Sequence, residues 1–134
     1  MASVNTMYNI IHPAQVLEIL TNEVDAAYID AYLNMDYEVW SLGESKFPGY
    51  IGKDTWISKT HPGQITHIIY WASKEAWKGL PEDAVMQLRR EAQKRVPGKY
   101  IKRISAYHVE NELVKIAEFR SPSSATYKQP DNDR

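Results

Sequence analysis

The spacing of apolar and polar residues along the chain predicts four β-strands and two helices. Residues 14–20 form a short apolar run that predicts the first strand. Residues 50–58 alternate in character and residues 65–72 are almost continuously apolar, and the Pro-Gly link between them predicts an antiparallel hairpin. Residues 100–109 alternate again and predict the last strand.

Helical periodicity fills the two intervals between these strands. The first helix is predicted from about Val24 to Leu42, with Asn22 as its N-terminal cap. The second helical stretch begins after Ser73, its predicted N-terminal cap, is interrupted by Pro81 and runs to about Val96. Two adjacent apolar stripes on the first helix indicate contact with more than one surface. The stripes are Val24, Ala27, Tyr28, Ala31 and Met35, and beside them Ile29, Leu33, Tyr37 and Trp40.

The order β-α-β-β-α-β is typical of the ferredoxin-like α+β fold, a split βαβ arrangement in which a four-stranded antiparallel sheet carries both helices on one face. The other face of such a sheet needs a cover, and the chain has no further helix or sheet to supply one. An identical sheet from a second copy is the simplest cover, so the pattern predicts a homodimer.

The chain of 134 residues has the length of one domain. We assign residues 14–112 to the ferredoxin-like domain, residues 1–13 to an N-terminal arm and residues 113–134 to a C-terminal extension. Residues 113–120 are weakly apolar and would either extend the last strand or cross to a partner. Residues 121–134 are polar and rich in Ser, Pro and Asp, which predicts disorder.

Composition narrows the classes of protein that the chain fits. It has no cysteine, which excludes disulfides, thiolate metal sites and cysteine nucleophiles. No apolar run approaches ~18 residues, and the first basic residue is Lys46, so neither a membrane span nor a secretory signal is predicted and a cytoplasmic location is expected. Residues 1–45 carry acidic side chains and no basic ones, whereas the remainder is net basic. This asymmetry favours self-association, or else reflects two solvated faces of different charge.

Two stretches carry a resemblance to a known group of proteins. VWSLGESKFPGYIGKDTWIS (39–58) and IIYWASKEAWKGLP (68–81) resemble the dimeric α/β-barrel superfamily, which includes antibiotic-biosynthesis monooxygenases and haem-degrading monooxygenases. Within it the chain most resembles a family of small uncharacterised proteins found mainly in cyanobacteria. The resemblance covers roughly residues 14–110, and its motifs mark turns and packing.

The resemblance implies a barrel made by dimerisation, with a pocket between each sheet and its helices. Active members oxidise aromatic polyketides without metal or flavin, or bind haem. The haem-degrading members use a His on the second helix and an Asn on the first strand. Here residues 73–96 contain no His and residues 14–20 contain no Asn, so the haem site is not carried over and no cofactor is expected.

Cofactor-free oxidation needs an apolar pocket with a few groups that orient and deprotonate the substrate. Trp71 is a candidate because related barrels place an aromatic residue at that strand end. His67 and His108 are candidate catalytic bases, since histidine titrates near neutral pH. For each of these residues packing in the core is the alternative interpretation. The candidate ligand-binding residues of the pocket wall are Tyr28, Tyr32, Trp56 and Tyr70.

Metal and nucleic-acid sites find little support in the sequence. The four histidines (His12, His61, His67 and His108) show no i,i+4 pair and no HExxH spacing, so no metal ligand is assigned. The basic residues between Arg89 and Arg103 raise the alternative of an RNA-binding sheet. The strand at 65–72 is too apolar to face water, which favours a buried dimer face over RNA.

Three functional hypotheses follow from these patterns. The first is a homodimeric barrel with a small apolar pocket, acting as a monooxygenase-like enzyme on a small aromatic or apolar molecule. The second is a non-catalytic module that binds a small ligand or a partner on the same scaffold. The third is the RNA-binding sheet. The pocket, the oligomeric state and salt-dependent RNA binding discriminate among them.

Overall fold

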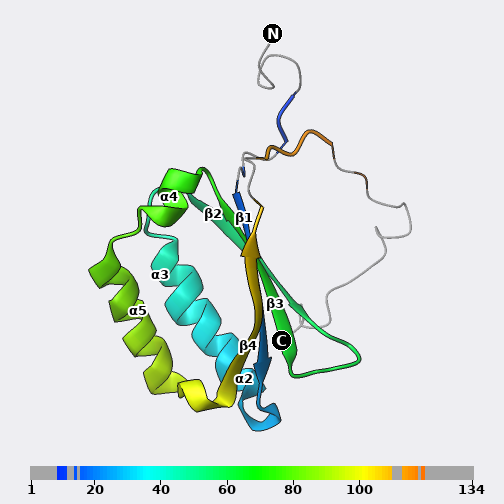
Figure 1. The fold of residues 1–134 in the computed structure, drawn as a ribbon, viewed down its shortest axis with the longest axis vertical. Helices are drawn as coiled ribbons and strands as arrows, with labels where there is room; N and C mark the ends of the chain where they lie inside the picture. The colour runs from blue at the N-terminus through cyan, green and yellow to red at the C-terminus, as the bar shows by residue number, and fades with distance from the viewer. Residues whose placement is uncertain (1–8, 12–13, 15, 110–112, 118, 120–134) are drawn as a thin grey trace, which may run out of the picture.

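A computed structural model describes residues 9–11, 14, 16–109, 113–117 and 119 (Figure 1). One four-stranded sheet forms its centre, in the order β2-β3-β1-β4, and all neighbouring strands are antiparallel. The strands are β1 (Val16–Val24), β2 (Tyr50–Ile57), β3 (Gln64–Trp71) and β4 (Ile101–His108). The element order and topology confirm the predicted α+β ferredoxin-like fold.

The helices lie together on one face of this sheet (Figure 1). The first crossover begins with a short 3₁₀ turn, and its helix changes geometry twice before it ends at Glu44. The second crossover has a short helix and a longer one, separated at Pro81 as predicted. The elements are η1 (Ala26–Tyr28), α2 (Ile29–Met35), η2 (Asp36–Ser41), α3 (Leu42–Glu44), α4 (Lys74–Lys78), α5 (Glu82–Arg95) and η3 (Gly98–Tyr100).

Strand β1 is longer than the sequence predicts, and Asn22 is not a helix cap. The strand continues to Val24, and Asn22 pairs with Ile65 of β3 and with Arg103 of β4. The polar run Thr21-Asn22-Glu23 looks like a turn in the sequence, but Asn22 faces the helices and its side chain is hydrogen-bonded on both sides. Buried polar side chains need such partners, and here they allow a polar residue inside a strand.

The buried face of the first helix also differs from both predicted stripes. Tyr32, Met35 and Val39 are buried, whereas Ala31 is exposed and Tyr37 is 61% exposed. The segment η2 is a π-helix, in which each turn takes more residues than in an α-helix. A prediction that assumes 3.6 residues per turn therefore assigns the wrong buried residues after Met35.

Bulges in both outer strands set which side chains point towards the helices. The pairing of β2 with β3 shifts between Tyr50 and Gly52, so that Tyr50 and Lys53 both face the helices. The pairing of β1 with β4 shifts between Thr21 and Asn22, which brings Arg103 to the same side. Such extra residues commonly re-aim side chains beside functional sites.

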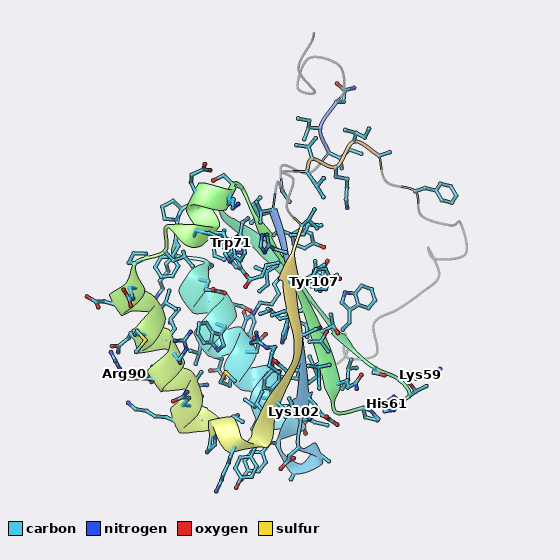
Figure 2. The ribbon with its side chains drawn as sticks, in the orientation of Figure 1. Lys59, His61, Trp71, Arg90, Lys102 and Tyr107 are labelled. Carbon is cyan, nitrogen blue, oxygen red and sulfur yellow. The ribbon has the colours of Figure 1, made fainter. Side chains whose placement is uncertain are left out.

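No helix of the described chain covers the opposite face of the sheet (Figure 1). The strand registers place apolar side chains on that face. Trp56 is 63% exposed and Tyr107 is 58% exposed. Figure 2 shows Tyr107 on this side and Trp71 on the side of the helices. With Tyr70 and the inner-strand residues these side chains form what we call the open face: Leu17, Ile19, Trp56, Ile68, Tyr70 and Tyr107.

The predicted terminal segments fall mostly outside the described residues. Of the N-terminal arm, Ile11 donates a backbone hydrogen bond of 2.8 Å to the carbonyl of Lys115 in the C-terminal extension. The segment 121–134 lies outside the described residues. In the part of the chain that is described, no helix combines the length and apolar character that crossing a bilayer requires.

Candidate functional site

A cavity of about 530 Å³ lies between the sheet and the helices. This volume falls within the range of about 300–1,000 Å³ that small-molecule sites occupy. Trp40, Trp77, Leu80 and Ile69 contribute apolar surface to it. Polar and charged side chains from the sheet and from the first helix also line it, and they include Glu18, Asn22, Tyr32, Asp36, Glu44, Lys53, His67 and Arg103.

A chain of short hydrogen bonds joins three of the lining residues. The Nε2 atom of His67 lies 2.7 Å from the hydroxyl of Tyr32. The amide nitrogen of Asn22 donates to that same hydroxyl at 2.9 Å. His67 is 2% exposed and Tyr32 is 4% exposed, so the geometry is held inside the protein rather than in solvent. A phenol in this position can donate its hydroxyl proton to the imidazole nitrogen and accept one from a group bound in the cavity.

The other nitrogen of His67 faces a second set of partners. Its Nδ1 atom lies 3.0 Å from the hydroxyl of Thr55 and 3.7 Å from a carboxylate oxygen of Asp36. Lys53 donates to both carboxylate oxygens of Asp36, at 3.0 and 3.1 Å. This buried ion pair provides an anion beside the imidazole and fixes its position.

Burial controls the protonation of this group. Desolvation lowers the pKa of His67, which Asp36 partly opposes, so His67 is neutral at neutral pH and can accept a proton. Burial raises the pKa of Tyr32 to about 12. Tyr32 is therefore a neutral phenol at neutral pH.

Two carboxyl groups also line the cavity. Burial raises the pKa of Glu44 to about 7, and Lys53 opposes this shift. Burial likewise raises the pKa of Glu18, against the effect of the hydrogen bonds from Trp71 and Trp77. The Trp71 indole nitrogen donates to Glu18 at 3.2 Å.

The π-helical segment aligns the helix side of the cavity. Tyr32, Asp36, Trp40 and Glu44 follow one another at intervals of four residues, and all four line the cavity. In a pure α-helix this interval exceeds one turn by about 0.4 residue, so the side chains would drift around the axis. The wider turns of η2 compensate for this drift.

The structure brings two of the predicted site residues together and places two others beside them. His67 and Tyr32 are in direct contact in the cavity. Trp71 is fully buried behind the cavity, with Tyr50 packed edge-on at a centroid distance of 5.3 Å. The rings of His108 and Trp77 pack together with their centroids 4.6 Å apart. His108 also lines a separate pocket of about 120 Å³, which Glu18 lines as well.

The remaining predicted pocket residues lie away from the cavity. Trp56 and Tyr70 belong to the open face, where the Tyr70 hydroxyl donates to Asp54 at 2.5 Å. Tyr28 stacks on Tyr100 at 3.9 Å near the start of the first helix. Their expected place in the pocket wall is therefore corrected: strand alternation turns Trp56 and Tyr70 to the other side, and Tyr28 lies one helical turn before Tyr32.

Sequence reasoning missed most of the charged lining. The sequence predicts a helix cap at Asn22, and it gives Lys53, Asp36 and Arg103 no pattern that marks them as site residues. Lys53 and Asp36 come from different elements and meet only in the fold. One sequence pattern does bear on Lys53. It lies on the same side of its strand as Ile57, and one side of that strand must face the core. Among the described residues no group of three His, Asp or Glu side chains has the arrangement of a metal site.

The fold and this cavity define a class of protein, a ferredoxin-like α+β domain with a polar-lined pocket under its sheet. No protein-family model and no curated protein matches the sequence. Many solved structures match, and they include antibiotic-biosynthesis-monooxygenase-like proteins of the same fold.

Three of these structures illustrate the likeness. A monooxygenase from the gene ActVA-Orf6 of Streptomyces coelicolor, in complex with Nanaomycin D, has a TM-score of 0.57 at 12% identity, covering 81% of this chain and 94% of that one. SnoaB, a cofactor-independent oxygenase from Streptomyces nogalater, has a TM-score of 0.53 at 11% identity, covering 81% and 98%. A dimeric ferredoxin-like protein from an uncultured marine organism has a TM-score of 0.51 at 17% identity, covering 81% and 93%. At these identities the likeness shows the fold alone.

Proposed function

We propose that the chain binds a small aromatic molecule in the 530 Å³ cavity and oxidises it with O₂ without a cofactor, using His67 as the base. The observation that carries the proposal is the hydrogen-bonded pair of Tyr32 and His67, buried and facing a cavity of ligand size. SnoaB, a cofactor-independent oxygenase, and the Nanaomycin D complex on the same fold add support.

The reaction requires a substrate with an acidic C–H bond. His67 takes one proton from a CH₂ group through Tyr32, and the resulting carbanion adds O₂ to give a peroxide. His67 returns the proton to the peroxide. Loss of water, which includes the second CH₂ hydrogen, leaves a new carbonyl group. One oxygen atom of O₂ enters the product, the other leaves as water, and no external reductant is needed. The lowered pKa of His67 keeps it neutral and ready for the first step.

Anthrone is a suitable probe, because its central CH₂ group is acidic and its oxidation by O₂ gives anthraquinone and water. We expect wild-type protein to accelerate anthraquinone formation over the buffer rate. His67→Gln and Tyr32→Phe should each lower that acceleration by about 100-fold, the usual scale for general-base catalysis. His61→Gln, an exposed histidine in the turn between β2 and β3, is the matched control and should keep the full rate. Equal rates in wild type and His67→Gln would refute the proposed base.

The alternative is a binding module without catalysis. It is favoured by the network itself, since no buried side-chain nitrogen or oxygen among the described residues lacks a hydrogen-bond partner. A fully satisfied network is suited to a rigid pocket. Binding of Nanaomycin D can be measured by the quenching of tryptophan fluorescence. Saturable binding without turnover of anthrone would favour this alternative over the enzyme.

We further propose that two copies pair through the open face. Trp56 and Tyr107 leave large aromatic surfaces exposed there, and such contiguous apolar surface on a monomer marks an interface. The neighbour described as dimeric supports this assembly. We also propose that the chain is related to the cyanobacterial family that it resembles and that it is located in the cytoplasm.

A further inference from the structure

We propose that Arg103 is a positioning residue that fixes the tautomer of His67 through three successive hydrogen bonds. In this arrangement the proton lies on Nδ1, and the lone pair of Nε2 points at Tyr32. The consequence for catalysis rests on the function proposed above, whereas the tautomer itself does not.

Arg103, at the outer end of this series of hydrogen bonds, determines which group donates and which accepts in each of them. A guanidinium group has donors and no acceptor. Its Nε atom lies 2.6 Å from Asn22 Oδ1, so the amide oxygen of Asn22 must face Arg103. The amide nitrogen then faces the other way and donates to the Tyr32 hydroxyl at 2.9 Å. An amide without such a neighbour can rotate by half a turn and exchange its oxygen and nitrogen.

The second step passes this direction to His67. The Tyr32 oxygen accepts from Asn22, and its single hydrogen remains to be donated. Nε2 of His67 lies 2.7 Å away and can accept it. A nitrogen that accepts carries no proton, which leaves the proton of the neutral ring on Nδ1.

The far side of the ring is consistent with this assignment. Nδ1 faces the Thr55 hydroxyl at 3.0 Å and the Asp36 carboxylate at 3.7 Å. An ionised carboxylate offers acceptors alone, so it favours a proton on the nitrogen beside it. Arg103 and Asp36, at opposite ends of the network, therefore select the same tautomer and aim the basic nitrogen at the hydroxyl that lines the cavity.

The test reads the two ring nitrogens of His67 by long-range ¹H–¹⁵N NMR on the full chain labelled at histidine. Arg103→Glu reverses the polarity at the outer end, because its Oε atom stands as many bonds from Cα as the Arg Nε and can only accept. Asn22 should then turn its nitrogen outward, Tyr32 should donate to Asn22, and the His67 proton should move to Nε2. Lys102→Glu is the matched control, since it makes the same charge change at the adjacent position. Lys102 pairs with Glu23 and Arg103 with Asn22, so their side chains lie on opposite faces of the sheet.

We expect Nδ1–H in the wild type and in Lys102→Glu, and predominantly Nε2–H in Arg103→Glu. Nε2–H in the wild type, or unchanged Nδ1–H in a folded Arg103→Glu, would overturn the proposal. If Arg103→Glu does not fold, Asn22→Asp tests the same point, because its carboxylate accepts from both Arg103 and Tyr32 and forces His67 to donate from Nε2.

Anthrone turnover separates this proposal from the previous one. A wild type that never oxidises anthrone defeats the proposed function and leaves the tautomer result to decide the role of Arg103. If the wild type is active, Arg103→Glu should lose at least 10-fold in rate at a pH where Lys102→Glu loses nothing. A swapped tautomer with an unchanged rate would show that Arg103 does not position the base.

Discussion

At the scale of single residues, Glu44 shows the clearest conflict between burial and charge. Its carboxyl lines the cavity, and burial raises its pKa to about 7, with further contributions from Glu18 and Asp36. Lys53 opposes the shift, but its ammonium is hydrogen-bonded to both oxygens of Asp36. A carboxyl group in this position is stable when protonated and destabilises the fold when it ionises.

This conflict predicts how stability changes with pH in Glu44→Gln. Because the folded-state pKa lies above the unfolded value, the stability that protonated Glu44 provides is complete near pH 4 and is lost as pH rises through 7. The neutral amide removes that loss. At pH 8.5 the variant should therefore be more stable than wild type by roughly 2 kcal/mol, with no such gain at pH 4. Urea denaturation at the two pH values measures the difference.

Glu23→Gln is the control for this experiment, because Glu23 is an exposed glutamate on β1 and does not line the cavity. The gain in stability at pH 8.5 should be absent from this variant. A Glu44→Gln variant no more stable than wild type at pH 8.5 would mean that the Glu44 carboxyl is solvated when ionised.

At the scale of the elements, Gly49 fixes the entry into β2. Its φ angle is +87°, a conformation that favours glycine, and a Cβ atom here would collide with the Cβ of Ala76 on α4. Its carbonyl also accepts from Ala72 at 2.7 Å, which ties the turn to the end of β3.

We therefore expect Gly49→Ala to lower the free energy of unfolding by about 2 kcal/mol, from the left-handed backbone and from the collision together. Gly52→Ala is the matched control, since a Cβ there meets no atom within 4 Å. In the double variant Gly49→Ala/Ala76→Gly the collision disappears and the backbone strain remains. Equal midpoints in urea for Gly49→Ala and Gly52→Ala would contradict this account of the turn.

The same elements show what local sequence signals can and cannot reveal. Ser73 is a predicted cap, and its hydroxyl does accept from the Ala76 amide, because capping depends on neighbouring residues alone. The hairpin of β2 and β3 is likewise predicted from its strands and its Pro-Gly turn. The bulges and the π-helical segment are not predicted, since each depends on partners far along the chain.

Some residues of the candidate site can be predicted from the sequence, and others only from the fold. His67 and Tyr32 stand out as residue types suited to chemistry, and the fold brings them into contact. Asn22, Lys53 and Arg103 are ordinary polar residues in the sequence, and they reach the cavity only because bulges and strand pairing turn them towards it. A sequence therefore reveals a candidate base more readily than the polar groups that the fold places around it.

At the scale of the whole molecule, the two faces of the sheet differ in what covers them. The face towards the helices has its cavity and both apolar core clusters. On the open face, Thr21 and Thr66 share a hydrogen bond of 2.9 Å, and their neighbours there include Ile19, Ile68 and Trp56. Apolar surface exposed to water raises the free energy of a single chain. The proposed pairing buries this surface against the same face of a second copy, related to the first by a two-fold axis.

The proposed pairing through the open face fixes the mass expected in solution. The chain has a mass of 15.4 kDa, and light scattering on the wild type should give twice that value. Tyr107→Arg places a charge on the open face, on the edge strand β4. It should not disturb the protomer, because Tyr107 is already 58% exposed, and the mass should fall to that of one chain. Tyr37→Arg makes the same change on the helix side at 61% exposure and should leave the dimer intact. A wild type with the mass of one chain at micromolar concentration would reject the pairing, and it would leave the cavity on the other face as the site to explain.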